Sequence, residues 1–508
     1  MRVNRLTGVC VIIILLGAGC KEKPEAVTVE EPKKTPTSET EYFAVFMEGK
    51  KVGYAIQSRR QSDGKVTTTE EVSITMNRAG VPITINTAET SIETAEGKPL
   101  GFEATQKLGA MEMKVVGTVD EDGMVKITTS SMGGEASDAL VWPQGAMMAE
   151  GLRLLAEEKG LKAGVEYDAK IFSAAMMQAV DAHIRVGGKE EVDLLGRVVP
   201  LTEVVTTMNM PGAGEITSTS YVDDQLRVQK NLVPIAGMQI EMVACAKEFA
   251  LGKNDVFEVI NKLFLASPVP LDNPDGAAAI TYTLSPLEGG ELNIPSTDNQ
   301  QVHTGPDGKV TVTVRPVAAS SGQQFPYAGN DEAVAAATKP NRFLQSEDEQ
   351  IVRLARKAIG GTKDAAEAVK RIEQFVAEYI DNKDLSIGYA SAAEVAASRQ
   401  GDCSEHAVLT AAMCRAVGIP ARVVTGVAYV DDWSGLQGFG GHAWVEAYVG
   451  RRTGRWVGLD ATFKGTGRGG YGPGHIALAI GDGEPADFFN LAATLGKFKI
   501  DKVEVDRR

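Results

Sequence analysis

The chain is poor in cysteine, with five in 508 residues. Two of them, Cys10 and Cys20, lie at its start, which leaves Cys245, Cys403 and Cys414 for the rest of the sequence. Such a small and odd set excludes a disulfide framework. Cys403 and Cys414 would lie about three turns apart on one helix, too far to bridge. At least one thiol is therefore expected to stay free.

Positive charge is also scarce. The chain has 52 Lys and Arg against 67 Asp and Glu, a net charge of −15 that becomes −17 if Arg2 and Arg5 are removed with an N-terminal signal. This balance excludes nucleic acid as an expected partner. No cofactor is expected either. The stretch "GTGRGG" at 465–470 has the spacing of a dinucleotide-binding loop, but "YGPGHIAL" follows it instead of a helix.

The first twenty residues have the pattern of a secretion signal. Arg2 and Arg5 precede the run "LTGVCVIIILLGAGC", which is too short to span a bilayer as a helix. The end of this run resembles the bacterial lipoprotein box, in which the cysteine is acylated and becomes the new N-terminus. We expect a signal peptide at 1–19 and a lipid anchor on Cys20; an ordinary cleaved signal is the alternative. Lys21 replaces the Asp that retains such proteins at the inner membrane, which predicts an outer-membrane location facing the periplasm or the cell surface.

The segment after the signal, "KEKPEAVTVEEPKKTPTSETE", consists almost entirely of Pro, Thr, Ser and charged residues. It cannot bury enough apolar surface to fold. Residues 20–41 are therefore predicted to be a disordered tether that begins at the lipidated cysteine.

From about 42 to 255, apolar and polar residues mostly alternate, which is typical of strands in an antiparallel sheet. One helix is predicted within this domain, with Pro143 near its start and Gly160 at its end. His183 is interpreted as a surface or strand histidine and not as a ligand. Examples of the alternation are "YFAVFMEGKKVGYAIQSRR", "TTTEEVSITMN", "MEMKVVGTV" and "MQIEMVAC".

Residues 256–340 are rich in Pro and Gly and contain the strand pattern "KVTVTVRPV", so they are predicted to form a small β unit or a connector. The periodicity then changes to the spacing of three and four that marks helices, in "EDEQIVRLARKAIGG" and "DAAEAVKRIEQFVAEYI". A C-terminal domain is therefore expected at 341–508.

The stretch "GDCSEHA" at 401–407 predicts a helix that begins at a cysteine. Asp402 and Glu405 have the spacing of a capping box, which places Cys403 at the first helical position. Unpaired backbone N–H groups and the positive end of the helix dipole favour a thiolate there. Gly418 and Pro420 are expected to end the helix.

A nucleophilic cysteine needs a base, and the sequence offers two histidines. His406 lies one turn along the same helix, where little room would remain for a substrate. His442 begins the strand pattern "HAWVEAYV", and "RWVGLDATF" follows after a short turn. A hairpin loop of three or five residues pairs even numbers with even numbers, so Asp460 is expected opposite His442 or one step away on the same face. Cys403, His442 and Asp460 would then supply the thiolate, imidazole and carboxylate of a catalytic triad.

The three stretches "GDCSEHA", "GHAWVEAYV" and "WVGLDATF" resemble the three motifs of the transglutaminase-like superfamily, over roughly residues 340 to 480. The resemblance implies a papain-like cysteine core with Cys403 as nucleophile, His442 as base and acid, and Asp460 as orienter. It makes the fold class α+β, with N-terminal antiparallel β-sheet and a C-terminal transglutaminase-like domain. Members of the superfamily cross-link glutamine to amines, cleave peptide bonds or remove glycans from asparagine.

Two further expectations concern the surroundings of this site. The glycine-rich stretch with Trp433 and Phe439 just before His442 is predicted to be a flap over the substrate, with a solvated linker as the alternative. A zinc site built from Cys403, His406, His442 and Asp460 is the other interpretation of those residues. We expect no metal, because the nucleophile, base and orienter already explain the set. No "DxDxDG" loop occurs, so calcium dependence is not expected.

The sequence therefore predicts a lipid-anchored extracytoplasmic cysteine enzyme that acts on protein or peptide amides through a thioester. Hydrolysis, as in a protease or amidase, is favoured because nothing in the sequence marks an amine site. The alternatives are a protein-glutamine gamma-glutamyltransferase, or a non-catalytic scaffold lipoprotein whose β domains bind an envelope partner.

Overall fold

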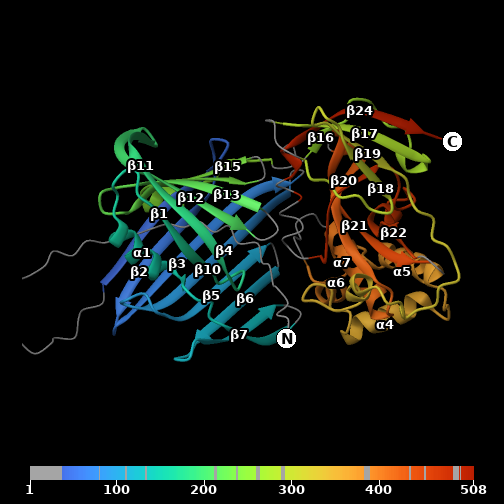
Figure 1. Cartoon of the computed structure of the whole chain (residues 1–508), viewed down its shortest axis with the longest axis horizontal. Coiled ribbons are helices and arrows are strands. Elements are labelled where there is room, and N and C mark those ends of the chain that lie inside the picture. Colours follow the sequence, from blue (N-terminus) through green and yellow to red (C-terminus); the bar gives the residue numbers. More distant parts are fainter. Residues whose placement is uncertain are drawn as a thin grey trace, which may run out of the picture. The chain divides into compact units, whose positions relative to one another are not determined.

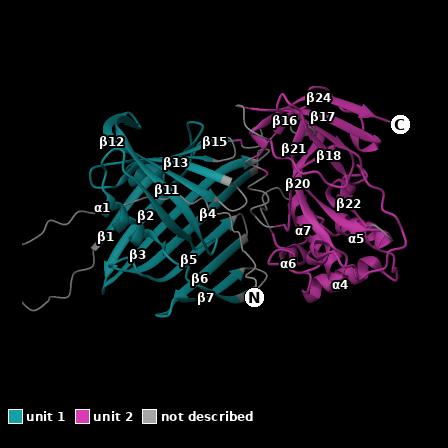
Figure 2. Cartoon of the chain, in the orientation of Figure 1, with its two compact units in different colours: residues 1–77, 82–257 teal, residues 78–81, 258–508 magenta. Residues whose placement is uncertain are grey.

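The computed structural model divides the chain into two compact units (Figure 2). One comprises residues 1–77 and 82–257, and the other 78–81 and 258–508. The first unit ends at residue 257, two residues after the end expected for the β domain. The structure describes residues 37–78, 81–108, 111–131, 134–210, 214–235, 238–258, 264–287, 292–382, 390–433, 436–450, 454–483, 491 and 494–507.

The first unit is built on one 15-stranded sheet (Figure 1). Its order is β8-β7-β6-β5-β4-β3-β2-β1-β15-β14-β13-β12-β11-β10-β9, so nearly every strand pairs with its neighbour in the chain. The strands are β1 (Thr37–Met47), β2 (Lys50–Ser62), β3 (Lys65–Arg78), β4 (Val81–Thr94), β5 (Pro99–Leu108), β6 (Met111–Val119), β7 (Met124–Ser131), β8 (Gly134–Val141), β9 (Ala146–Met147), β10 (Glu166–Ser173), β11 (Gln178–Leu194), β12 (Arg197–Met210), β13 (Gly214–Val222), β14 (Val228–Ile235) and β15 (Met238–Ala244).

The large N-terminal sheet confirms the strand pattern of the sequence, and its register shows how the core forms. Phe43 pairs with Ala244, and Val45 with Met242; Phe43, Val45 and Met242 are buried, and Phe43 and Val45 share a face because alternate residues of a strand point to the same side. Strands distant in the sheet order share a core as well. Phe102 of β5 and the ring of Phe172 in β10 lie 5.0 Å apart.

The start of this sheet corrects the predicted tether. β1 begins at Thr37, which pairs with Gln61, and Glu39 pairs with Arg59. Residues 37–41 are therefore strand and not linker. The polar composition of this stretch suggested disorder, but its backbone is ordered by pairing with β2. The remainder of the tether, and Cys20, lie outside the described residues.

Helix α1 (Ala149–Lys159) is the helix predicted in this unit, and it ends at Gly160 as expected. It begins after Met148 and not near Pro143, because a buried carboxylate caps it from the sheet. Glu93 accepts hydrogen bonds from the backbone N–H groups of Glu150 at 2.6 Å and Gly151 at 3.0 Å. The Glu150 carboxylate in turn pairs with Arg59 of β2 at 2.8 Å.

The second unit packs two sheets and a group of helices (Figure 1). The five-stranded sheet has the order β16-β21-β20-β23 with β22 paired to β21, and the four-stranded sheet has the order β18-β19-β17-β24. Its strands are β16 (Phe264–Ala266), β17 (Ala279–Pro286), β18 (Gln300–Thr304), β19 (Val310–Val314), β20 (Ala421–Trp433), β21 (Leu436–Val449), β22 (Arg455–Leu459), β23 (His475–Gly481) and β24 (Phe498–Asp506).

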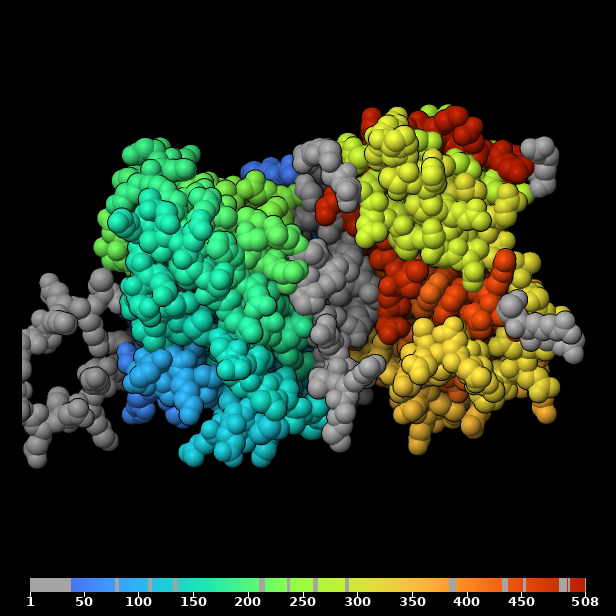
Figure 3. Space-filling view, viewed as in Figure 1, coloured from blue at the N-terminus to red at the C-terminus, as the bar shows by residue number. Residues whose placement is uncertain are grey.

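The segment expected as a separate unit at 256–340 belongs to this second unit. Its strand β17 pairs with β24 from the C-terminal end of the chain, and Tyr282 with Val503. Figure 3 shows this yellow-green segment beside the red C-terminal strand. Both sheets share one hydrophobic core, in which Tyr282 and Phe439 lie 5.5 Å apart. The structure therefore has no domain boundary near 340. The strands of this segment form one sheet with β24, which lies near the C-terminus.

Helix α7 (Cys403–Ala416) is the central helix of the group, and it packs against β20 and β21. Its residues from Ser404 to Arg415 are all buried. Among the described residues, none of the helices combines the length and apolar character needed to cross a membrane. The other described helices of this unit are α3 (Glu332–Ala336), α4 (Glu349–Ile359), α5 (Ala365–Tyr379), α6 (Ala392–Ser398), α8 (Ala461–Gly465) and the short 3₁₀ helix Pro274–Gly276, and α2 (Lys247–Ala250) belongs to the first unit.

The capping of α1 by Glu93 gives a stability prediction. Glu93→Ala should lower the free energy of unfolding by at least ~2 kcal/mol, because two buried backbone N–H groups lose their acceptor. Urea unfolding of the chain without residues 1–20 measures this effect. Glu96→Ala, at an exposed position nearby, is the control and should have little effect. Equal stability of the two variants would contradict the capping role.

Candidate active site

Cys403 is the first residue of α7 and is half-buried. The predicted capping box is present: Asp402 accepts the N–H of Ser404 at 3.0 Å, and Glu405 accepts the N–H of Asp402 at 2.9 Å. The sulfur therefore lies where helical N–H groups have no partner in the preceding turn. This position favours a negative charge on the thiol.

Glu405 also ties the start of α7 to the preceding chain, because its carboxyl group accepts the N–H of Ala390 at 2.9 Å. Burial, reinforced by the charge of Asp402, raises the pKa of Glu405 to about 8. Glu405 is therefore mainly protonated at neutral pH, so the helix start carries less negative charge beside Cys403 than two ionised carboxylates would impose.

His442 lies in β21, and its ring is buried. Its Nε2 atom lies 2.8 Å from Asp460 Oδ2, and its ring stacks on Phe463 with 4.5 Å between ring centroids. With Nε2 engaged by the carboxylate, Nδ1 is the nitrogen left for the sulfur. Cys403 forms a side-chain hydrogen bond to this histidine. The structure thus brings the three predicted residues together.

The charges of the site explain its protonation. Burial alone would lower the pKa of His442, but the charge and hydrogen bond of Asp460, with a smaller contribution from Cys403, raise it to about 10. Burial would likewise raise the pKa of Asp460, yet the hydrogen bonds and charges of the neighbouring histidines hold it well below its usual range. At neutral pH the site therefore holds an aspartate and an imidazolium.

The register between β21 and β22 pairs even numbers with even numbers, as expected: Glu446 with Gly458, and Tyr448 with Trp456. Asp460 comes just after β22 and is the N-cap of α8, where Oδ1 accepts the N–H of Phe463 at 3.0 Å. Its own N–H donates to the buried Glu373 of α5 at 2.8 Å. Backbone and side chain of Asp460 are therefore both fixed.

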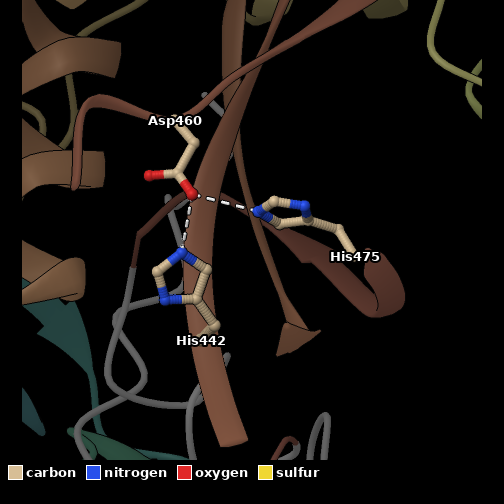
Figure 4. A group of neighbouring side chains, drawn as sticks. All are labelled: His442, Asp460 and His475. Atoms are coloured by element: carbon tan, nitrogen blue, oxygen red, sulfur yellow. Dashed lines mark hydrogen bonds and ion pairs between the residues drawn. The ribbon is translucent and has the colours of Figure 1, made fainter. Parts of the chain in front are cut away.

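His475, the first residue of β23, is the site residue that sequence reasoning missed. Its Nε2 atom lies 3.0 Å from the same Asp460 Oδ2 that binds His442, and its side chain is fully buried. Figure 4 shows the two imidazoles approaching one carboxylate oxygen. The available signal was a histidine at the start of the apolar stretch "HIALAIG", directly after the turn "YGPG".

The predicted flap is wrong for the described residues. Phe439 is completely buried, and its ring packs at 5.3 Å from Tyr429 in the core. The stretch consists of the paired strands β20 and β21, whose glycines allow close contact with neighbouring backbone: a Cβ on Gly438 would lie 2.4 Å from the carbonyl oxygen of Leu265. Trp433 ends β20, but its side chain lies outside the described residues.

His406 does not join the other site residues in a donor group. It is buried, and its Nδ1 lies 2.6 Å from the carbonyl oxygen of Asp402, in the preceding turn of α7. Among the described residues, the donor group that fits a metal is His442, Asp460 and His475, with ligand atoms within 4.8 Å of one another. The alternative zinc set that included His406 is therefore not the one the fold assembles. The distances of 2.8 and 3.0 Å within the group are those of hydrogen bonds.

Comparison with known proteins identifies the core of this unit. Residues 352–461 match the model of the transglutaminase-like superfamily, which confirms the resemblance of the three motifs. The match runs from within α4 to the first residue of α8, and so includes Cys403, His442 and Asp460. This region of the chain is therefore a transglutaminase-like domain, a class of typically cysteine-based enzymes.

Two solved structures show remote likeness. A candidate cysteine protease from Cytophaga hutchinsonii is 21% identical, with a TM-score of 0.29, and the match covers 45% of this chain and 88% of that one. A beta-barrel-like protein of a domain of unknown function from Brucella abortus is 14% identical, with a TM-score of 0.32, over 41% of this chain and 94% of that one. No curated protein matches the chain.

The ion pair predicts how His442 titrates. Because its pKa is raised, the imidazolium persists until the pH rises through about 10. In Asp460→Asn the buried ring loses its counter-charge, so the midpoint should fall below the ordinary value of about 6.5. NMR of the ring Cε1–H signals measures both midpoints. Asp307→Asn, on an exposed turn, is the control and should leave the His442 midpoint unchanged. A midpoint that stays near the wild-type value in Asp460→Asn would refute the ion pair.

Proposed function

We propose that this protein is a membrane-tethered cysteine enzyme that transfers acyl groups from protein or peptide amides through a thioester on Cys403. The observation that carries the proposal is the buried contact of 2.8 Å between His442 and Asp460, with Cys403 hydrogen-bonded to the same imidazole. In this papain-like triad, Cys403 is the nucleophile, His442 the general base and acid, and Asp460 the orienter.

The acylation step follows from these positions. The Cys403 thiolate attacks the carbonyl carbon, a C–S bond forms, and the carbonyl electron pair moves onto oxygen. The N–H groups at the start of α7, that of Cys403 among them, are suited to stabilise this oxyanion. When the tetrahedral intermediate collapses, the C–N bond breaks, and the leaving nitrogen takes the proton from His442.

Deacylation returns the site to its starting state. A water molecule gives one proton to His442 and attacks the thioester carbon, after which the C–S bond breaks. The products are a carboxylic acid and the original thiolate with its imidazolium. The same thioester could instead react with an amine, so hydrolysis and transamidation differ in the acceptor and not in the triad. Hydrolysis is the reaction we propose.

The proposal extends to the place of action. Acylation of Cys20 would hold the protein at the outer membrane, facing the periplasm or the cell surface, with several acyl chains for firm anchoring. The large sheet of the first unit would then be available to an envelope partner. The signal pattern of residues 1–20 supports this assignment.

The nucleophile is tested first by alkylation, which requires no substrate. In a soluble form without residues 1–20, iodoacetamide should label Cys403 rapidly already at pH 6, because a thiolate and not a thiol reacts. His442→Ala should slow this labelling by about tenfold or more. Cys245 is the internal control: burial raises the pKa of its thiol, so it should label slowly in both proteins.

Two outcomes would overturn the proposal or change its reaction. Slow labelling of Cys403 that does not depend on His442 would indicate a dormant core and favour a scaffold protein. A Cys403→Ala protein that retains every activity would do the same. Incorporation of a fluorescent primary amine into a protein substrate, without cleavage, would make the enzyme a protein-glutamine gamma-glutamyltransferase instead of a hydrolase.

The lipid anchor is tested separately. Cys20→Ala should move the full-length protein from the membrane fraction to the soluble fraction of a bacterial host, because the acylated residue is lost. Cys10→Ala is the matched control: it lies in the segment that is removed, so anchoring should persist. Mass spectrometry of the N-terminal peptide reads the acylation directly. Membrane association that survives in Cys20→Ala, or an unacylated wild-type terminus, would refute the anchor.

A further inference from the structure

Asp460 Oδ2 is shared by two imidazoles from different strands. His442 Nε2 lies 2.8 Å from it and His475 Nε2 lies 3.0 Å from it, and all three side chains are buried. A carboxylate oxygen has two lone pairs, so it can accept both hydrogen bonds. The charge that holds the proton on His442 is therefore divided between two donors.

His475 is held in the orientation that this contact requires. Its Nδ1 atom lies 3.0 Å from the carbonyl oxygen of Gly472 and 3.4 Å from the N–H of the same residue. The loop that carries these groups packs against Asp275, whose Cα would lie 2.7 Å from a Cβ on Gly472. The ring is also enclosed by Tyr471, at 4.9 Å, and by Trp444, at 5.1 Å. Nε2 has therefore little freedom to turn away from the carboxylate.

The strand geometry explains how the two histidines meet. β20 lies between β21 and β23, and Gly426 of β20 pairs with His442 on one side and Ala477 on the other. A Cβ on Gly426 would lie 2.0 Å from the carbonyl oxygen of Ile476 and 2.8 Å from the ring of Trp444. The absence of a side chain at this position lets β23 and the Trp444 ring approach closely.

We propose that His475 is a positioning residue of this site, which fixes the Asp460 carboxylate toward His442 and takes up part of its charge. The inference rests on the proposed function of Cys403 and His442. Its consequence for catalysis is specific. If His442 were the only donor to this oxygen, Asp460 would hold the proton on His442 more tightly, and the proton would pass less readily to the leaving nitrogen. The second donor weakens this hold, so His442 can still act as a general acid.

The other titratable groups around the site do not share this role. Glu373 contacts the backbone N–H of Asp460 and not its carboxylate, and Lys464 lies 4.0 Å from Glu373. Arg468 stacks on Phe463 and pairs with Asp275 at 2.8 Å. Burial raises the pKa of Tyr471 well above its ordinary value, so its hydroxyl stays protonated over the working range.

The test compares two substitutions of His475 by the NMR midpoint of His442. His475→Phe fills the aromatic surroundings but removes the donor, so the His442 midpoint should rise above the wild-type value by about one pH unit, the size of one hydrogen bond to a charged group. His475→Gln can still donate through its amide and should keep the wild-type midpoint. His303→Gln, an exposed position in the same unit, controls for the loss of a histidine.

The direction of the shift separates charge sharing from a structural role. If His475→Phe only damaged the fold, the site would open to solvent and the His442 midpoint would fall toward about 6.5, while labelling of Cys403 at pH 6 would slow. Charge sharing predicts a rise, with labelling at pH 6 within about threefold of wild type. An unchanged or lowered midpoint in His475→Phe overturns the inference, and so does a midpoint raised equally in His475→Gln.

The same data distinguish this inference from the proposed function. If Cys403 in the wild-type protein labels slowly and without dependence on His442, the proposed function fails whatever His475 does. If labelling depends on His442 but the midpoint does not move in His475→Phe, the proposed function stands and only the positioning role is lost.

Discussion

The site depends on one buried carboxylate. Asp460 accepts hydrogen bonds from His442 and His475 through a single oxygen, caps α8 through the other, and is tied to α5 through its backbone N–H. A buried charge is costly unless it is paired and hydrogen-bonded. Here the cost is offset by contacts with β21, β23 and two helices, so the elements that carry the site are the same ones that stabilise the charge. Removal of any one contact would affect both fold and protonation.

Position along one helix explains why only one of its two thiols is suited to react. Cys403 and Cys414 both belong to α7, yet Cys414 lies deep in the core, where burial raises the pKa of its thiol to about 12. Cys403 lies at the positive end of the helix and contacts an imidazolium. The core position of Cys414 therefore disfavours a thiolate, whereas Cys403 lies beside a positive charge. Most of the helix therefore packs in the core, while its first turn presents the positive end of the helix dipole to Cys403.

The sequence predicted the parts of the site that follow from local rules. The capping box came from the spacing of Asp402 and Glu405, and the meeting of His442 with Asp460 came from hairpin parity. His475 could not be found in this way, because it lies fifteen residues beyond Asp460 on a strand separated from β21 by β20. The boundary near 340 failed for a similar reason, since β17 pairs with the C-terminal strand. The glycine-rich flap failed because glycine signals close backbone approach as well as mobility.

The two histidines also show why a strong ion pair alone would make a poor enzyme. A charge that raises the pKa of His442 to about 10 keeps the imidazolium formed, which favours the thiolate, but it also opposes proton transfer to the leaving group. Both needs are met only if the carboxylate is fixed firmly and its charge is moderated. A second hydrogen-bond donor on the same oxygen does both. A lysine or arginine in its place would satisfy Asp460 more strongly, and would repel the imidazolium 5.6 Å away between ring centroids. A histidine on β23 is thus suited to the task, because its Nε2 atom reaches the shared carboxylate oxygen at hydrogen-bond distance.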